Sequence, residues 1–226
     1  MRQIFIYLLS SLFQSSLADQ AWDCVQCQNV PSNVQFEILT KAEKARRLQG
    51  PKAPTPKPSS AAKVSGNAVV AAQPVRGTKP GSPMQRNRVV AVLGGEAADH
   101  EGQDYPAPRG TKIFSFGPGK VCRRNFSGDF GNVVEIAHGN VNYQNSTLQG
   151  MSTRYAHLSQ FNVRPNTIIS DANTTIGRVG SSGQSTGPHL HFEVRYQNSL
   201  GPTPQGCYRD LTLNPGRGFV CDPLSF

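Results

Sequence analysis

Short apolar runs of β-prone residues, separated by Gly, Asn and Asp turns, fill the chain from about residue 88 to its C-terminus. They are RVVAVL (88–93), TKIFSF (111–116), GKVCRR (119–124), GNVVEIAH (131–138), STRYAHL (152–158), TTIGRVG (174–180) and HLHFEVRY (189–196). In none of these runs do the apolar residues recur with the period of an α-helix over enough residues to predict a helix. Residues 88–226 therefore predict one all-β, largely antiparallel domain, large enough to bury its own core.

The first 18 residues, MRQIFIYLLSSLFQSSLA, have a different pattern. A basic start at Arg2 precedes a short apolar run, and small residues occupy positions 16 and 18. This order is typical of a secretory signal peptide, and the apolar run is too short to span a bilayer. We expect an exported protein that begins near Asp19, resides in the periplasm or cell envelope or is secreted, and is not integral to the membrane.

Two further segments precede the β-rich region. Residues 19–50 form a short N-terminal segment, and its stretch FEILTKAEKARRLQ (36–49) has the composition of a helix. Residues 51–87 are rich in Pro, Ala and Lys. Such a composition cannot bury enough apolar surface to offset the chain entropy lost on folding, which predicts an extended, disordered linker.

The net charge of +9 is concentrated before the β-rich region. The stretch from Lys41 to Arg88 contains eleven Lys and Arg and one Glu, so it exceeds the net charge of the whole chain. A cationic linker in an exported protein fits attraction to an anionic envelope surface, or a merely solvated spacer. Nucleic acid is not expected as a partner, because the basic stretch lacks interleaved aromatic residues and a folded basic face.

The chain contains five cysteines. In an exported protein they would be in an oxidising compartment, where disulfides form and persist. Cys207 and Cys221 lie close together near the C-terminus and are the predicted pair, contributing roughly 3 kcal/mol in the chain-entropy model. Cys24 and Cys27 have the spacing of a redox motif, but no βαβ pattern surrounds them, which favours a local bridge or a tether. Cys122 is left without a predicted partner.

All five histidines of the chain lie in the predicted β domain. His189 and His191 are two apart in one β-prone run, so their side chains project from the same face of a strand. His100 and Asp104 are four apart in HEGQD. Two neutral imidazoles and one carboxylate are the donors of a catalytic zinc site. They leave the Zn²⁺ ion with a net charge near +1, and this charge lowers the pKa of a bound water molecule to about 7.

Three motifs occur in a fixed order: HEGQD (100–104), YAHL (155–158) and GRVGSSGQSTGPHLHFE (177–193). Together they resemble the lysostaphin/LytM-type zinc metallopeptidases, which cut peptide bonds in bacterial peptidoglycan. The resemblance covers roughly the last 130 residues and implies an antiparallel sheet with a groove over it for the peptide stems of peptidoglycan.

The resemblance also implies roles for individual residues. His100, Asp104 and His191 would bind one Zn²⁺, and His157 and His189 would be catalytic. One of these two would be the general base for the zinc-bound water, and the other would stabilise the oxyanion or protonate the leaving amine. His138 has no role by motif, and we expect a structural hydrogen bond at the groove wall.

Several alternatives remain open at this point. Asp104 before Tyr-Pro also fits turn chemistry, and His157 also fits a packed strand histidine. Relatives that have lost zinc ligands act as scaffolds or activators of cell-wall hydrolases, which is the alternative function here. Residues 19–50 are the candidate contact with an envelope protein complex. A cupin would need a glutamate later than Glu193. The bond cleaved could be D-Ala–diaminopimelate or a glycine bridge.

Overall fold

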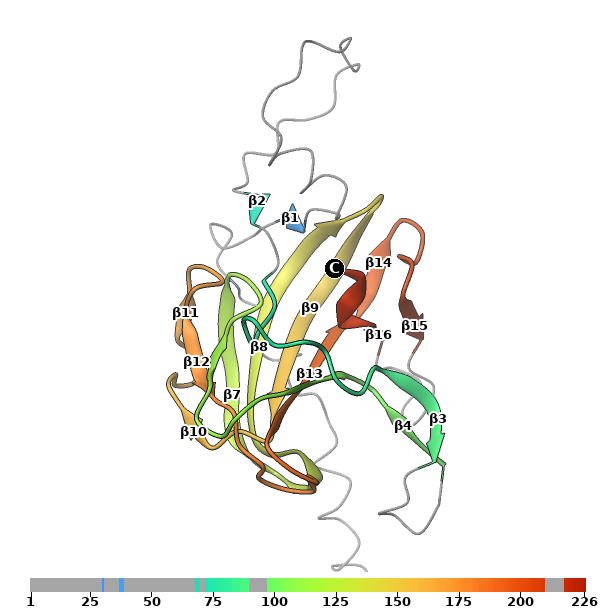
Figure 1. The fold of residues 1–226 in the computed structure, drawn as a ribbon. Coiled ribbons are helices and arrows are strands. Elements are labelled where there is room, and N and C mark those ends of the chain that lie inside the picture. Colours follow the sequence, from blue (N-terminus) through green and yellow to red (C-terminus); the bar gives the residue numbers. More distant parts are fainter. Residues whose placement is uncertain (1–29, 31–36, 39–67, 70–71, 90–96, 210–217) are drawn as a thin grey trace, which may run out of the picture.

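A computed structural model describes residues 30, 37–38, 68–69, 72–89, 97–209 and 218–226 (Figure 1). Its strands are β1 (Glu37–Ile38), β2 (Ala68–Val69), β3 (Gln85–Val89), β4 (Ala97–His100), β5 (Gln103–Pro106), β6 (Lys112–Phe114), β7 (Gly119–Ser127), β8 (Gly131–Tyr143), β9 (Ser146–Ala156), β10 (Gln160–Phe161), β11 (Ile168–Ile169), β12 (Thr175–Arg178), β13 (His189–Tyr196), β14 (Asn198–Leu200), β15 (Cys207–Arg209) and β16 (Phe219–Cys221). The only helices in these ranges are the 3-10 turns η4 (Gly128–Phe130) and η5 (Pro223–Ser225). The prediction of an all-β, largely antiparallel domain is confirmed.

One large sheet carries the fold, in the order β11-β7-β8-β9-β13-β16-β15. The long strands β8, β9 and β13 run through its middle (Figure 1). Strand β13 pairs with β9 along one edge, and with β5 and then β16 along the other. Two smaller sheets, β10-β12-β6 and β3-β4, complete the described strands. Strand β13 is therefore bordered on both sides over most of its length.

Alternation along β13 separates an apolar face from a polar one. Leu190, Phe192, Val194 and Tyr196 belong to the hydrophobic core, each no more than 1% exposed. The core continues into neighbouring elements through Tyr105, Ile113, Phe116, Val134, Tyr155, Leu158 and Ile176. The intervening residues of β13, from His189 to Arg195, are all histidines or charged residues and share the opposite face. The apolar face builds the domain, and the polar face is left for chemistry.

The structure differs from the predicted linker over residues 72–87. Val75 is fully buried in the core, and the backbone N–H groups of Ala72 and Phe114 donate to Phe116 O and Pro74 O. Earlier still, Ile38 is 1% exposed in the same core, and β1 pairs with β8 in parallel. Composition predicts disorder because these segments are poor in apolar residues, but the few they have pack into a core made by the rest of the chain.

The remaining predictions for the N-terminal region lie outside the described residues. This holds for the signal peptide, the Cys24–Cys27 bridge and most of the expected helix over 36–49. Of that helix, Glu37 and Ile38 are described, and they are a strand. In the part of the chain that the structure describes, no helix is long and apolar enough to cross a membrane.

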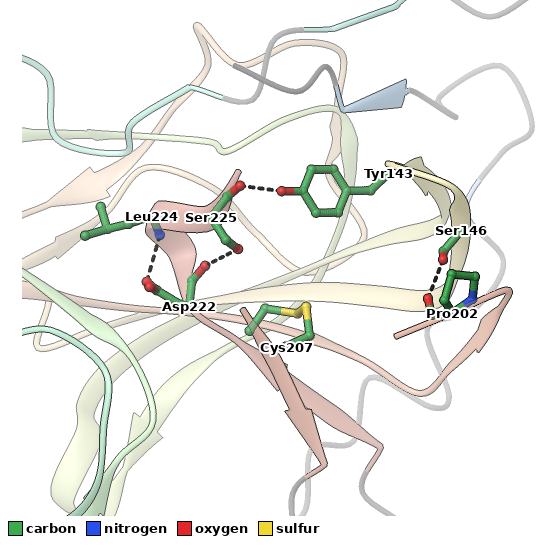
Figure 2. The surroundings of a disulfide bond; sticks show 8 residues. Tyr143, Ser146, Pro202, Cys207, Asp222, Leu224 and Ser225 are labelled. Carbon is green, nitrogen blue, oxygen red and sulfur yellow. Dashed lines mark hydrogen bonds between the residues drawn. A yellow bond between two sulfur atoms is a disulfide. The ribbon is translucent and has the colours of Figure 1, made fainter. Parts of the chain in front are cut away.

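The C-terminus is fastened to the sheet by a disulfide and by hydrogen bonds (Figure 2). Cys207 of β15 and Cys221 of β16 are cross-strand neighbours and form the predicted disulfide. Beyond it, the Tyr143 hydroxyl at the end of β8 donates to Ser225 O (Figure 2). Cys122 is also disulfide-bonded.

Candidate metal centre and active site

Strand register brings together residues that are far apart in the chain. In the β13–β5 pair His191 lies opposite Asp104, and in the β13–β9 pair it lies opposite Ala156, which precedes His157. His100 ends β4, and only Glu101 and Gly102 separate it from β5. All five sequence-predicted site residues therefore converge on the polar face of β13.

His100, Asp104 and His191 offer three donor atoms that lie within 4.8 Å of one another. Nε2 of His100 is 3.1 Å from Nδ1 of His191, and each nitrogen is 3.1 Å from Asp104 Oδ1. A tetrahedral zinc site with bonds of 2.0–2.1 Å would hold its ligand atoms about 3.3 Å apart. The observed triangle is therefore close to the size that such an ion requires.

In each histidine of the triangle, the nitrogen that points away from Asp104 already has a hydrogen-bond partner. Nδ1–H of His100 donates to Pro83 O over 2.7 Å, and Nε2–H of His191 donates to Glu193 Oε1 over 3.0 Å. These bonds leave the lone pairs of His100 Nε2 and His191 Nδ1 directed at the Asp104 carboxylate. Three converging acceptor atoms repel one another unless a positive charge lies between them, so the donor set fits a metal cation.

The pKa values in this triangle show the same attraction for positive charge. Burial lowers the pKa of His191, but hydrogen bonds with Asp104 and Glu193 and their negative charges outweigh it and raise the pKa to about 9. Burial likewise opposes ionisation of Asp104, yet hydrogen bonds with His100 and His191 hold its pKa well below the usual range. A bound cation would satisfy the same groups in place of a proton.

His157 and His189 lie beside the triangle with their ring centroids 4.7 Å apart. Nδ1–H of His157 donates to Ser182 O over 2.8 Å, and Nδ1–H of His189 donates to Gly187 O over 2.8 Å. Each ring therefore presents Nε2 to the site, and Nε2 of His189 is 3.8 Å from Asp104 Oδ1. The two rings therefore lie side by side next to the candidate metal position.

His157 is held in an uncommon conformation. Its φ is 61°, a left-handed value that costs a non-glycine residue of order 1–3 kcal/mol. Its backbone N–H donates to Phe130 O over 2.9 Å, which ties the turn to η4. Burial lowers the pKa of His157 to about 4, with smaller contributions from neighbouring groups. The imidazole is therefore neutral near pH 7 and able to accept a proton at Nε2.

Gly102 lies between the two candidate ligands of the HEGQD motif, at a position where no side chain fits. A Cβ on Gly102 would lie 2.6 Å from Phe192 O and 2.8 Å from Nε2 of His191. The backbone of the motif thus approaches β13 more closely than any other residue would permit. This contact sets the distance between His100 and the strand that carries His191.

Residues 81–83, which the sequence assigns to the linker, form part of the site. Gly81 N–H donates to Asp104 O and Asp104 N–H donates to Ser82 O, over 2.8 and 2.9 Å. The Gln103 amide also donates to Ser82 O. These bonds hold Pro83 O against His100. Sequence patterns give no signal for this role, because the group that acts is a backbone carbonyl.

The sequence motifs do not single out the buried charged residues that lie behind His191. Glu193, Arg195 and the cross-strand neighbour Arg154 are each less than 5% exposed. A usable signal was present, since His189, His191, Glu193 and Arg195 alternate along one strand and must share a face.

His138 lies in the protein interior, away from the metal triangle. It is fully buried, and Nδ1–H donates to Pro118 O over 2.5 Å while Nε2 is 2.8 Å from Thr153 Oγ1. The expected structural hydrogen bonds are present, but the ring lies in the interior and not at a groove wall. Burial lowers the pKa of His138 to about 4.

This shift predicts a pH dependence of stability. The unfolded chain binds a proton at position 138 below about pH 6.5, and the folded protein does so only below about pH 4. Stability is therefore complete above pH 6.5 and is lost as the pH falls toward 4, by about 3 kcal/mol from this group. In urea unfolding with chelator present, the free energy of unfolding of His138→Asn should fall by about 3 kcal/mol less than that of the wild type between pH 6.5 and pH 4.

His157 titrates in both proteins, so it does not contribute to this difference. If the free energy of unfolding depended on pH equally in both proteins, the assignment of the effect to His138 would be wrong.

The fold and the site define a class of protein: an all-β domain in which two histidines and a carboxylate from strands β4, β5 and β13 form a candidate set of metal ligands. The family model Peptidase family M23 matches residues 98–202. This match, over somewhat less than half of the chain, confirms the resemblance of residues 98–202 to the lysostaphin/LytM-type peptidases.

Relatives of this chain with curated names point to the same family. DD-carboxypeptidase/endopeptidase Mpg of Neisseria meningitidis is 41% identical over 96 residues, which cover 42% of this chain and 20% of Mpg. Peptidoglycan DD-endopeptidase ShyC of Vibrio cholerae is 36% identical over 99 residues, covering 44% and 21%. This chain thus spans about a fifth of the length of these relatives. The crystal structure of a zinc containing peptidase from Vibrio cholerae is 32% identical with a TM-score of 0.46, covering 54% of this chain and 35% of that one.

Proposed function

We propose that this protein is an exported, zinc-dependent endopeptidase that hydrolyses peptide cross-links of bacterial peptidoglycan. The observation that carries the proposal is the triangle of His100, Asp104 and His191, with protons directed away from it and two further histidines beside it. The M23 domain and the DD-endopeptidase names of its relatives support the same substrate class.

Zinc is the proposed metal because of the donor set. Two neutral imidazoles and one carboxylate are ligands of catalytic zinc sites, which keep a further position open. When bound, zinc would lower the pKa of a water and polarise the carbonyl of the scissile peptide. His100, Asp104 and His191 would hold it.

The protein's own groups would then manage the protons. Peptide hydrolysis adds water to the carbonyl carbon, moves one proton from that water and delivers one to the leaving nitrogen as the C–N bond breaks. His157 and His189 both have Nδ1–H bonded to a backbone carbonyl, so both offer Nε2 as the acceptor. One would accept the proton from water, and the other would stabilise the oxyanion or protonate the amine.

The N-terminal region supplies the cellular context of the proposal. Residues 1–18 would direct export and be removed, which places the enzyme in the periplasm or envelope or outside the cell. The basic linker would bring it to an anionic envelope surface, and residues 19–50 would contact an envelope protein complex. These roles are independent of the chemistry at the metal centre.

Digestion of purified sacculi tests the function and identifies the bond. The zinc-loaded protein should convert cross-linked muropeptide dimers with D-Ala–diaminopimelate bridges into monomers, identified by mass spectrometry. Sacculi with glycine bridges serve as the parallel substrate, and chelator-treated protein as the blank. Binding to both kinds of sacculi without release of any new muropeptide would favour the scaffold or activator role instead.

A further inference from the structure

Behind His191 lies a buried row of charged side chains that extends across three strands. Glu193 of β13 is the cross-strand neighbour of Arg154 on β9, which in turn is the neighbour of Glu135 on β8. The side chains of these three residues are 0%, 5% and 1% exposed. Ion pairs at this depth lose hydration that their mutual attraction only partly offsets, so the row is a costly way to stabilise a sheet.

The two carboxylate oxygens of Glu193 have different partners. Oε1 accepts from His191 Nε2 over 3.0 Å. Oε2 accepts from Arg195 Nε over 3.1 Å, and Arg154 Nη1 lies 3.6 Å from the same oxygen. Each arginine has a second acidic partner, Glu135 for Arg154 and Glu101 for Arg195. The arginines therefore fix the carboxylate and leave one oxygen directed at the ligand histidine.

The same row reaches the other ligand histidine through the chain. Arg195 Nη2 is paired with Glu101, which follows His100 directly in the sequence. The contacts thus run from His191 through Glu193 and Arg195 to Glu101, beside His100. Phe130 closes this region, with its ring 4.5 Å from the Arg154 guanidinium and 5.7 Å from the His191 ring.

We propose that Glu193, held by Arg154 and Arg195, is a positioning residue of the metal centre. It keeps the proton of His191 on Nε2 and the Nδ1 lone pair on the metal, and its negative charge makes the imidazole a stronger ligand. This inference rests on the proposed zinc site. Such outer partners of ligand histidines typically change metal affinity or activity 10–100-fold when they are replaced.

Glu193→Gln tests the proposal with little change in shape. The amide has one oxygen and one N–H₂ group, so it cannot accept from both His191 and Arg195. We expect zinc affinity, measured by competition with a chelator, to fall about 10–100-fold. Activity at saturating zinc should fall as well, because the His191 ring is less firmly oriented.

Glu135→Gln is the matched control. Glu135 is as buried as Glu193 and binds the same Arg154, through Nε and Nη2 at 2.9 Å, but no hydrogen bond joins it to His191 among the described contacts. Its variant should lose stability in chelator comparably while zinc affinity stays at the wild-type value. Urea unfolding of both metal-free variants establishes that each is folded.

Three results separate the possibilities. Weaker zinc binding in Glu193→Gln alone supports the positioning role. Equal zinc affinity in Glu193→Gln and wild type, or an equal loss in both variants, overturns that role and leaves the zinc site intact. A folded wild type that binds no zinc overturns the proposed function together with this inference.

Discussion

Asp104→Ala should abolish zinc binding and, with it, release of muropeptides. The wild type should contain close to one equivalent of zinc by elemental analysis. Asp104 supplies the only carboxylate of the described triangle, at 3.1 Å from both imidazole donors. Its removal leaves two neutral nitrogens, and we expect zinc affinity to fall more than about 100-fold, beyond the effect of losing an outer partner.

Asp171→Ala is the matched control for this prediction. Asp171 also carries a fixed carboxylate, but it accepts from Asn173 N–H in an exposed turn. This variant should keep zinc and activity. Because a ligand stabilises only the state that binds it, Asp104→Ala should gain no thermal stability from added zinc, unlike the wild type and the control. Near-stoichiometric zinc in Asp104→Ala would contradict the ligand assignment.

His189→Ala should lose activity while it retains zinc. The ring lies beside the triangle, and its Nδ1–H is bonded to Gly187 O, so its removal takes away a proton-transfer group and no ligand. Loss of a general acid or base lowers the rate typically 10²–10⁴-fold. The effect should appear in kcat, measured on a cross-linked muropeptide dimer with the zinc content determined on the same sample.

The control for this substitution is His138→Asn, which also removes one histidine from the domain. His138 is bonded to Pro118 O and Thr153 inside the core, so this variant should cleave the dimer at nearly the wild-type rate near pH 7. If His189→Ala lost its zinc, His189 would have to be reassigned as a ligand. If it kept full activity with zinc bound, the proton-transfer role would be wrong.

Much of the site follows from local sequence. The period of two in a strand requires His189 and His191 to share a face, and the HLHFEVRY run is β-prone enough to make that strand secure. The short spacing of Cys207 and Cys221 was sufficient to predict their bond. The three motifs were specific enough to point to the family that matches residues 98–202.

Only the tertiary structure decided what surrounds these motifs. Strand register places Asp104 opposite His191 across 87 positions of sequence, and no local pattern sets that register. Pro83 binds His100 through a carbonyl that every residue has, so its side chain carries no signal. Residues 72–87 have the composition of a linker because they contain few apolar side chains. They are ordered because those few side chains pack into a core that is built by other parts of the chain. The sequence by itself determined which side chains carry the chemistry; long-range pairing determined how they are held.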